Sequence, residues 1–279
     1  MLLKSLYILG DIGYYGNNLR KVISNFKYDS MLGNDEVVLL GDNFYPDGLQ
    51  SKFDNQWNKY ELAFQDVPYQ NIYSVMGNHD YYGNPFFQIN SKYMANNHLY
   101  FKKDFQDMDL YFIDTVLLYK NHVGITDDII KDLFNTSHRV LKEQQLEWLD
   151  YNLENSKLNN RKTIVFGHYP IVSNGLYAND LDPLYDTLMP LFSKYKVDVY
   201  ISGHEHNIQY IEKKVNDYKF RQIIIGSSSE YRSNEYRIIT KNDMYDNEDN
   251  YYLQLYKRNN LICLDFKNKN GIIKHSYKI

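Results

Sequence analysis

Seven side chains that could bind metal ions follow short apolar segments of this sequence, each at or soon after a glycine. They lie in the segments GDIG, GDNFY, GNHD, GHYP and GHEH, and they are Asp11, Asp42, Tyr45, Asn78, His168, His204 and His206. One ion takes about four to six ligands, and a carboxylate can bridge two ions. The set therefore favours two metal ions roughly 3.5–4 Å apart, a geometry suited to in-line displacement at phosphorus.

Each segment also has a purely structural interpretation when it is taken alone. A Gly-Asp pair after a strand is usually a turn, GNHD resembles an Asx turn, and a single histidine in an apolar context is more often a core residue. The five segments occur at equivalent positions, however, and GHEH carries the paired histidines typical of metal sites. No Walker-type loop and no arrangement around a nucleophilic serine or cysteine competes with the metal interpretation.

Apolar segments that stop at glycine supply the strands that would position these donors. Strands are predicted at 3–10, 36–41, 71–77, 109–115, 162–167, 197–203 and 220–226, and a closing hairpin at 261–277 with Asn270 and Gly271 at its turn. Helices are predicted at 53–65, 141–155 and 181–196. This alternation predicts an α/β fold with largely parallel sheets, whose strand ends would gather the donors at one edge.

Composition excludes several classes of protein. The chain has 279 residues, of which 43% are hydrophobic and 24% charged, and we expect one domain over 1–279 with polar excursions near 119–138 and 227–260. A net charge of −4 without a Lys/Arg cluster argues against nucleic-acid partners. No apolar run has the length of a membrane span. The single cysteine, Cys263, and the absence of a secretory signal predict an intracellular protein.

The ordered series of five segments resembles the metallophosphoesterase superfamily, and within it the purple acid phosphatases of the small, tartrate-resistant type. The similarity runs from Leu3 to about Gly226 and includes the connecting stretches TVLLY, EQQLEWL and HNIQY. It implies two mixed β-sheets packed as a sandwich and flanked by helices. It also implies an acid phosphatase in which a metal-bound hydroxide attacks a small phosphomonoester or a phosphoprotein.

The resemblance assigns a place to each donor. Most superfamily members carry Asp-x-His in the first segment, but Gly13 stands at the third position here, and in purple acid phosphatases the tyrosine of GDxxY, here Tyr45, replaces that histidine. A phenolate is a hard, anionic ligand that favours Fe(III). The implied Fe(III) ligands are Asp11, Tyr45, His206 and a bridging Asp42. The implied ligands of a divalent Fe, Zn or Mn ion are Asp42, Asn78, His168 and His204.

The same resemblance gives His79 a catalytic role, contacting the phosphoryl group or protonating the leaving oxygen, with Asp80 orienting its ring. The sequence departs from the family after GHYP, where relatives carry an acidic residue and a histidine but this chain has Leu176 and Tyr177. Leaving-group protonation, substrate and oligomeric state therefore stay open. The alternatives are a divalent-metal phosphodiesterase, nucleotidase or phosphoprotein phosphatase of the same superfamily, and a scaffold without turnover.

Overall fold

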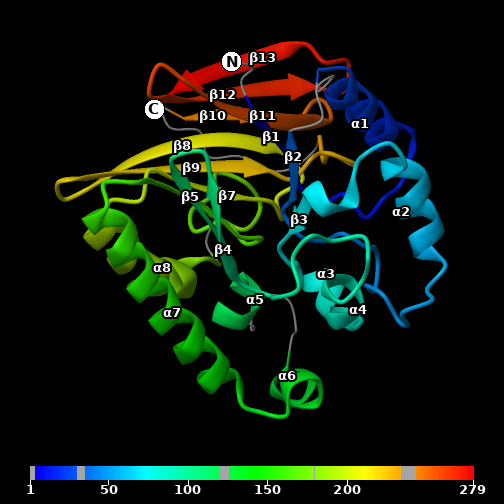
Figure 1. The fold of residues 1–279 in the computed structure, drawn as a ribbon, viewed down its shortest axis with the longest axis horizontal. Coiled ribbons are helices and arrows are strands. Elements are labelled where there is room, and N and C mark those ends of the chain that lie inside the picture. The colour runs from blue at the N-terminus through cyan, green and yellow to red at the C-terminus, as the bar shows by residue number, and fades with distance from the viewer. Residues whose placement is uncertain (1–3, 30–34, 120–125, 179, 234–242) are drawn as a thin grey trace.

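The structure is a computed structural model that describes residues 4–29, 35–119, 126–178, 180–233 and 243–279. In these residues two mixed sheets, one of six strands and one of seven, pack face to face, and helices cover both outer faces (Figure 1). The predicted α/β sandwich is confirmed. Within the same described ranges no helix is both long and apolar enough to cross a membrane.

The six-stranded sheet joins the two ends of the chain. Its order is β13-β12-β11-β1-β2-β3, with β1, β2 and β3 parallel and the other neighbours antiparallel. The predicted closing hairpin is β12 and β13, with Gly271 at φ +75° in the turn. The strands are β1 (Ser5–Leu9), β2 (Glu36–Leu39), β3 (Ile72–Ser74), β11 (Tyr251–Arg258), β12 (Leu261–Asn268) and β13 (Ile273–Lys278).

The seven-stranded sheet has a parallel centre and antiparallel edges. Its order is β10-β8-β9-β7-β6-β5-β4, and β5, β6, β7 and β9 are parallel. The strands are β4 (Phe101–Phe105), β5 (Met108–Phe112), β6 (Lys162–Phe166), β7 (Val199–Ser202), β8 (Ile208–Val215), β9 (Tyr218–Ile225) and β10 (Met244–Asp246). The predicted strands at 109–115, 162–167, 197–203 and 220–226 are all confirmed here.

Helices form the outer layers, and all three predicted helices are present. The helices against the six-stranded sheet are α1 (Asn17–Asp29) and α2 (Gln56–Phe64). Those in the layer on the seven-stranded sheet are α5 (Thr115–Leu118), α7 (His138–Leu158) and α8 (Asp182–Tyr195), and α6 (Asp127–Phe134) packs on α7. Two short helices, α3 (Asn78–Tyr82) and α4 (Phe86–Ile89), follow β3.

Strand β1 shows how the layers are held together. Successive side chains of a strand point to opposite faces, so Leu6 and Ile8 enter the apolar cluster between the sheets, whereas Tyr7 and Leu9 pack under α1 and α2. All four are buried. Burial on both faces explains why this strand has a continuous apolar sequence rather than an alternating one.

The two stretches predicted as polar excursions contain regular elements. Helix α6 lies in 119–138, and strand β11 lies in 227–260, where it pairs with both β1 and β12. Residues 120–125 and 234–242 of these stretches lie outside the described ranges. The sequence did not reveal β11 because tyrosine is amphipathic: Tyr251 is buried in the core while its hydroxyl donates to Asp246 at 2.6 Å.

Candidate metal centre

The predicted donors lie at strand ends from both sheets, and their backbone is strained there. Asp11, Asp42 and His204 have φ of 56°, 52° and 71°, the left-handed region that residues other than glycine rarely adopt. Each such residue costs on the order of 1–3 kcal/mol and persists only where its surroundings enforce it. The strain turns the chain sharply at each strand exit, which is a recurrent property of functional sites.

Glycines are needed because the strand ends pack backbone against backbone. A Cβ atom on Gly77 would lie 2.2 Å from Asp42 Oδ1, and one on Gly41 would lie 2.6 Å from the Gly77 nitrogen and 2.7 Å from His168 Nδ1. Gly41 also has φ of +89°. The glycines that mark the end of each apolar segment therefore permit the close approach of the donor-bearing turns.

Tyr45 is the centre of a first group of donors. Its hydroxyl oxygen lies 3.0 Å from Asp11 Oδ1, 3.1 Å from Asp42 Oδ2 and 3.2 Å from His206 Nε2. The fourth contact, between His206 Nε2 and Asp11 Oδ1, is 3.7 Å. All these residues are at most 7% exposed. Two carboxylates, a phenol and an imidazole thus face one another, and all four side chains are largely shielded from solvent.

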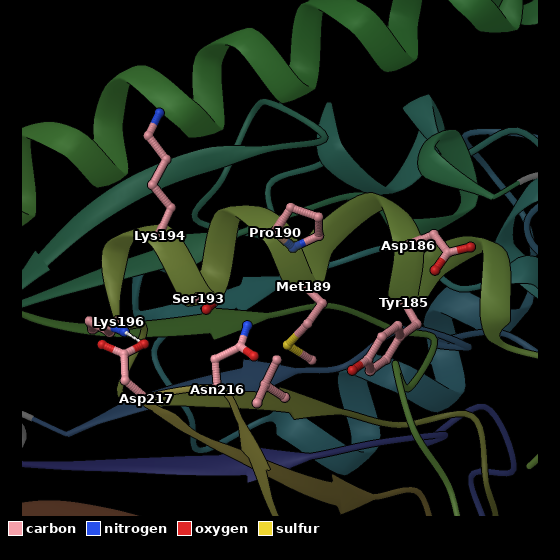
Figure 2. A pocket seen from close by; sticks show the side chains of 10 residues that line it. Tyr185, Asp186, Met189, Pro190, Ser193, Lys194, Lys196, Asn216 and Asp217 are labelled. Carbon is pink, nitrogen blue, oxygen red and sulfur yellow. Dashed lines mark hydrogen bonds and ion pairs between the residues drawn. The ribbon is translucent and has the colours of Figure 1, made fainter.

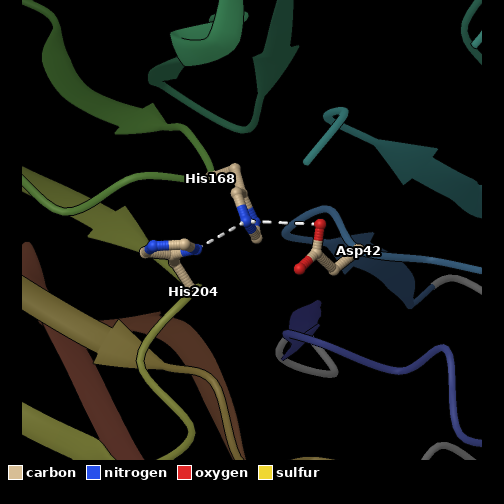
Figure 3. A group of neighbouring side chains, drawn as sticks. All are labelled: Asp42, His168 and His204. Atoms are coloured by element: carbon tan, nitrogen blue, oxygen red, sulfur yellow. Dashed lines mark hydrogen bonds and ion pairs between the residues drawn. The ribbon is translucent and has the colours of Figure 1, made fainter. Parts of the chain in front are cut away.

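His168 is the centre of a second group. Its Nε2 atom lies 3.1 Å from Asn78 Oδ1, 3.2 Å from His204 Nδ1 and 3.4 Å from Asp42 Oδ1. Figure 3 shows Asp42, His168 and His204 pointing toward one another, and one donor atom from each of these three lies within 4.8 Å of the other two. The Leu40 carbonyl accepts from His168 Nδ1 at 2.8 Å, which leaves Nε2 as a lone-pair donor to the centre.

Asp42 belongs to both groups. Its Oδ2 atom faces Tyr45, and its Oδ1 atom faces His168 and accepts from the His79 backbone nitrogen at 2.9 Å. All seven predicted donors are therefore brought together in two groups that share one carboxylate. This is the arrangement that a bridging ligand between two cations requires.

The pKa shifts of the donor side chains indicate that the centre favours positively charged ligands. Burial, and then the neighbouring Asp42 charge, raise the pKa of Asp11 well above its usual range. Burial and the charges of Asp11 and Asp42 likewise raise the pKa of Tyr45. Burial lowers the pKa of His168, and lowers that of His206 to about 3, so both imidazoles are neutral. Neutral imidazoles beside mutually repelling carboxylates suit a site for cations, which would reverse the shifts of the acidic groups.

His79 and Asp80, predicted as catalytic, occupy different places. The half-buried His79 donates through Nδ1 to the Pro46 carbonyl, and its Nε2 atom lies 4.0 Å from Asp42 Oδ2. Asp80 is fully buried and does not contact the His79 ring: its carboxylate accepts from the backbone nitrogens of Gly77 at 2.8 Å and Asn43 at 3.0 Å. Asp80 thus ties together the turns that carry Asp42 and Asn78, and it is Pro46 that orients His79.

Comparison with known proteins agrees with this geometry. Residues 4–207 match the calcineurin-like phosphoesterase family. The chain belongs to this family. Tartrate-resistant acid phosphatase type 5 of the rabbit, Oryctolagus cuniculus, is 33% identical to it over 199 residues, which are 67% of this chain and 59% of the rabbit protein. This phosphoesterase is therefore similar to an acid phosphatase, and it spans less than two thirds of that relative.

Solved structures support the same fold. GAP50, described as the anchor in the inner membrane complex of Plasmodium, is 22% identical and superposes with a TM-score of 0.79 over 100% of this chain and 89% of that chain. Purple acid phosphatase PPD1 from yellow lupin, Lupinus luteus, is 14% identical and has a TM-score of 0.72 over 100% of this chain and 54% of that chain. At these identities the two likenesses concern the fold alone.

Two residues that support the centre of this phosphoesterase lie inside the quoted motifs but were not singled out from the sequence. Asn43 of GDNFY bonds through Nδ2 to Ser74 Oγ at 2.9 Å and Gln88 Oε1 at 3.1 Å. Glu205 of GHEH is buried between two donor histidines and holds the loop after GHYP. Their position beside a donor in an apolar stretch was the signal in the sequence that could have identified them. A polar residue buried at such a place must be hydrogen-bonded, and so it supports its neighbours.

An open cavity of this phosphoesterase lies apart from the donors (Figure 2). It has a volume of about 570 Å³ and lies between α8 and the turn joining β8 to β9. None of the predicted site residues lines it. The lining residues are Tyr185, Asp186, Met189, Pro190, Ser193, Lys194, Lys196, Val215, Asn216 and Asp217. The candidate active site is therefore the place where the donors converge, and this cavity is a separate feature of the surface.

Proposed function

We propose that this chain is an acid phosphatase that hydrolyses phosphate monoesters at a centre of two metal ions. The observation that carries the proposal is the shared position of Asp42, whose two oxygens face two separate groups of donors. The family of the chain and its likeness to the rabbit acid phosphatase support the same reaction class. The substrate would be a small phosphomonoester or a phosphoprotein side chain.

The two groups of donors suit different ions. The first, with Asp11, Tyr45 and His206, includes a phenol that becomes a hard anionic ligand when deprotonated, and it would hold Fe(III). The second, with Asn78, His168 and His204, would hold a divalent Fe, Zn or Mn ion. When bound, such ions supply an activated water and offset the negative charge of the phosphoryl group.

His79 is the proton donor of the proposed reaction. The Pro46 carbonyl can only accept, so Nδ1 carries a hydrogen and Nε2 is the atom turned toward the donors. A phosphoryl group held at the centre would come within reach of Nε2. When the ring is protonated, Nε2 can donate to a phosphoryl oxygen or to the leaving oxygen, and its half-exposed position lets solvent restore the proton.

The first test is a visible absorption spectrum of the purified, iron-loaded protein beside Tyr45→Phe, with metal content measured on the same samples. We expect a broad visible band in the parent that disappears in Tyr45→Phe while iron stays bound. Tyr14→Phe is the matched control, since Tyr14 stacks on Tyr45 but is 47% exposed and outside the donor groups. A colourless, oxidised parent with two metals bound would remove Fe(III) from the proposal.

Substrate preference distinguishes the proposed monoester hydrolysis from the other activities of the superfamily. We expect turnover of p-nitrophenyl phosphate to exceed that of bis(p-nitrophenyl) phosphate clearly. The opposite order would favour a phosphodiesterase, and activity with divalent ions alone would favour the divalent-metal enzymes of the superfamily. A scaffold role is the remaining alternative, because the similarly folded GAP50 is described as an anchor. A protein that binds metal at neither group and hydrolyses neither ester would support that alternative.

A further inference from the structure

The sheet hydrogen bonds between β5 and β6 stop just before the donor His168. The Ile113 nitrogen still donates to the Phe166 carbonyl at 2.9 Å, and then the chain that leaves β5 turns into α5. On the other side of β6 the bonding continues, because the Gly203 nitrogen donates to the His168 carbonyl at 3.0 Å. The backbone nitrogens of His168 and Tyr169 therefore need acceptors that β5 no longer offers.

Thr115, the first residue of α5, supplies the acceptor for both nitrogens. Its Oγ1 atom accepts from the His168 nitrogen at 3.2 Å and from the Tyr169 nitrogen at 2.9 Å. All three residues are buried, and a buried backbone N–H group without a partner is costly. The start of α5 is fixed in turn by Gln145 of α7, which accepts from the Asp114 nitrogen at 2.7 Å and donates to the Asp114 carbonyl at 2.9 Å.

Tyr200 of β7 holds the same turn from the other side. Its hydroxyl donates to the Tyr169 carbonyl at 2.6 Å. A Cβ atom on Gly167 would clash with the Tyr200 hydroxyl and lie 2.7 Å from Thr115 Cγ2, so the two side chains enclose the backbone just before the donor. The turn is therefore held from two sides, by α5 and by β7.

The place of the His168 ring depends on this backbone. The ring donates through Nδ1 to the carbonyl of Leu40, which follows β2, and its Nε2 atom lies 3.1 Å from Asn78 Oδ1 and 3.2 Å from His204 Nδ1. A shift of the backbone would break the contact with Leu40 or move Nε2 away from the other donors. Loss of a group that orients a metal ligand typically lowers metal affinity about 10- to 100-fold.

We propose that Thr115 is a positioning residue for His168, assisted by Tyr200, and that it thereby sets the affinity of the second donor group for its ion. This role rests on the proposed function, in which that group holds the divalent ion. The hydroxyl of Thr115 acts only through the backbone at His168 and Tyr169. We therefore expect the divalent ion to depend on Thr115 much more than the ion of the Tyr45 group does.

Zinc titration of the metal-free protein tests this role. Free Zn²⁺ would be followed with a chromophoric chelator, and the binding event that disappears in His168→Ala identifies the second donor group. Thr115→Val keeps the shape of the side chain but removes the acceptor of two buried N–H groups, so the Kd of this event should rise about 10- to 100-fold. The Kd of the other event should change much less. Thr115→Ser, which keeps the hydroxyl, should restore the parental values.

Thr163→Val is the matched control, because Thr163 is also buried and lies on β6, but its hydroxyl has no hydrogen-bond partner in the described part of the chain. Tyr200→Phe removes one hydrogen bond from the same turn and should weaken the same zinc event as Thr115→Val, by a smaller factor. Its own control is Tyr218→Phe, which loses an equivalent bond of 2.7 Å to the Val197 carbonyl and should leave the event unchanged.

A parental Kd of the His168 event in Thr115→Val, or in Tyr200→Phe if Thr115→Val does not fold, would overturn the positioning role. Equal weakening of both zinc events with a lower Tm would also overturn it, because Thr115 would then act only on stability. A parent without an event that depends on His168 would leave no ion to position and would overturn it as well. If the parent binds zinc as expected but hydrolyses no phosphomonoester, the proposed function fails while the positioning role stands.

Discussion

The two sheets contribute different chemistry to one centre. The six-stranded sheet supplies oxygen donors at the exits of β1, β2 and β3, and the seven-stranded sheet supplies imidazoles at the exits of β6 and β7. Neither sheet completes either group of donors. Asp11 and Tyr45 need His206, and Asn78 needs the other two histidines. The comparison indicates that the metal centre can form only after the two sheets have packed against each other.

The most damaging change should be at Asp42, which serves both groups. Asp42→Asn keeps the size of the side chain but removes the shared negative charge, so we expect loss of bound metal and a fall in kcat/KM of at least about a thousandfold. Metal analysis and p-nitrophenyl phosphate kinetics would measure both. The control is Asp114→Asn, at the exit of β5, whose carboxylate accepts from Tyr81 and Leu117. Unchanged metal content in Asp42→Asn would contradict the bridging role.

Histidine variants should separate the two groups. His206→Ala should release the ion of the Tyr45 group, and His168→Ala should release that of the Asn78 group, so each variant keeps about one of the two ions. Metal analysis combined with electron paramagnetic resonance would show which ion stays. If both variants lost both ions equally, the two groups would act as one cooperative unit and the division between them would have no energetic meaning.

Removal of metal should weaken the contact between the sheets. Ions that bind only the folded protein stabilise it by about 4 kcal/mol at a thousandfold excess over Kd, which for a chain of this size corresponds to a fall in Tm on the order of 10 °C after chelation. Differential scanning calorimetry with and without chelator would measure it. Asp42→Asn provides the reference, because a chelator should leave its Tm unchanged; an equal fall in both proteins would indicate that the chelator acts elsewhere.

Asp114 gives the smallest expected effect, and it concerns pH. Burial raises the pKa of this carboxyl to about 7, above the value of about 3.8 for an exposed aspartate. The folded protein then binds the proton more tightly than the unfolded chain, so stability falls as pH rises from about 4 to 7. Asp114→Asn should remove this part of the loss, which is about 3 kcal/mol between pH 5 and pH 8. Urea unfolding of the metal-free protein at pH 5 and pH 8 would measure it, and an equal loss in both proteins would refute it.

The donors were predictable because their signal is local. An apolar segment, a glycine and a polar residue occur within a few positions, and sheet geometry then brings the ends of parallel strands together. Strand β11 was not predictable in the same way, since its pairing with β1 depends on a partner far away in the sequence. The contacts of Asp80 were also missed, because adjacency to His79 in the sequence says nothing about which backbone nitrogens its carboxylate meets.

The position of β11 has a consequence for how the protein is made. Strand β1, which leads into Asp11, pairs on one side with residues 253–256. During synthesis that side of β1 has no partner until residues 253–256 have left the ribosome, and an unpaired strand edge is a template for aggregation. Asp11 is therefore the first donor to be translated but one of the last to reach its final surroundings. Nascent chains halted before Tyr251 should depend on chaperones to avoid aggregation.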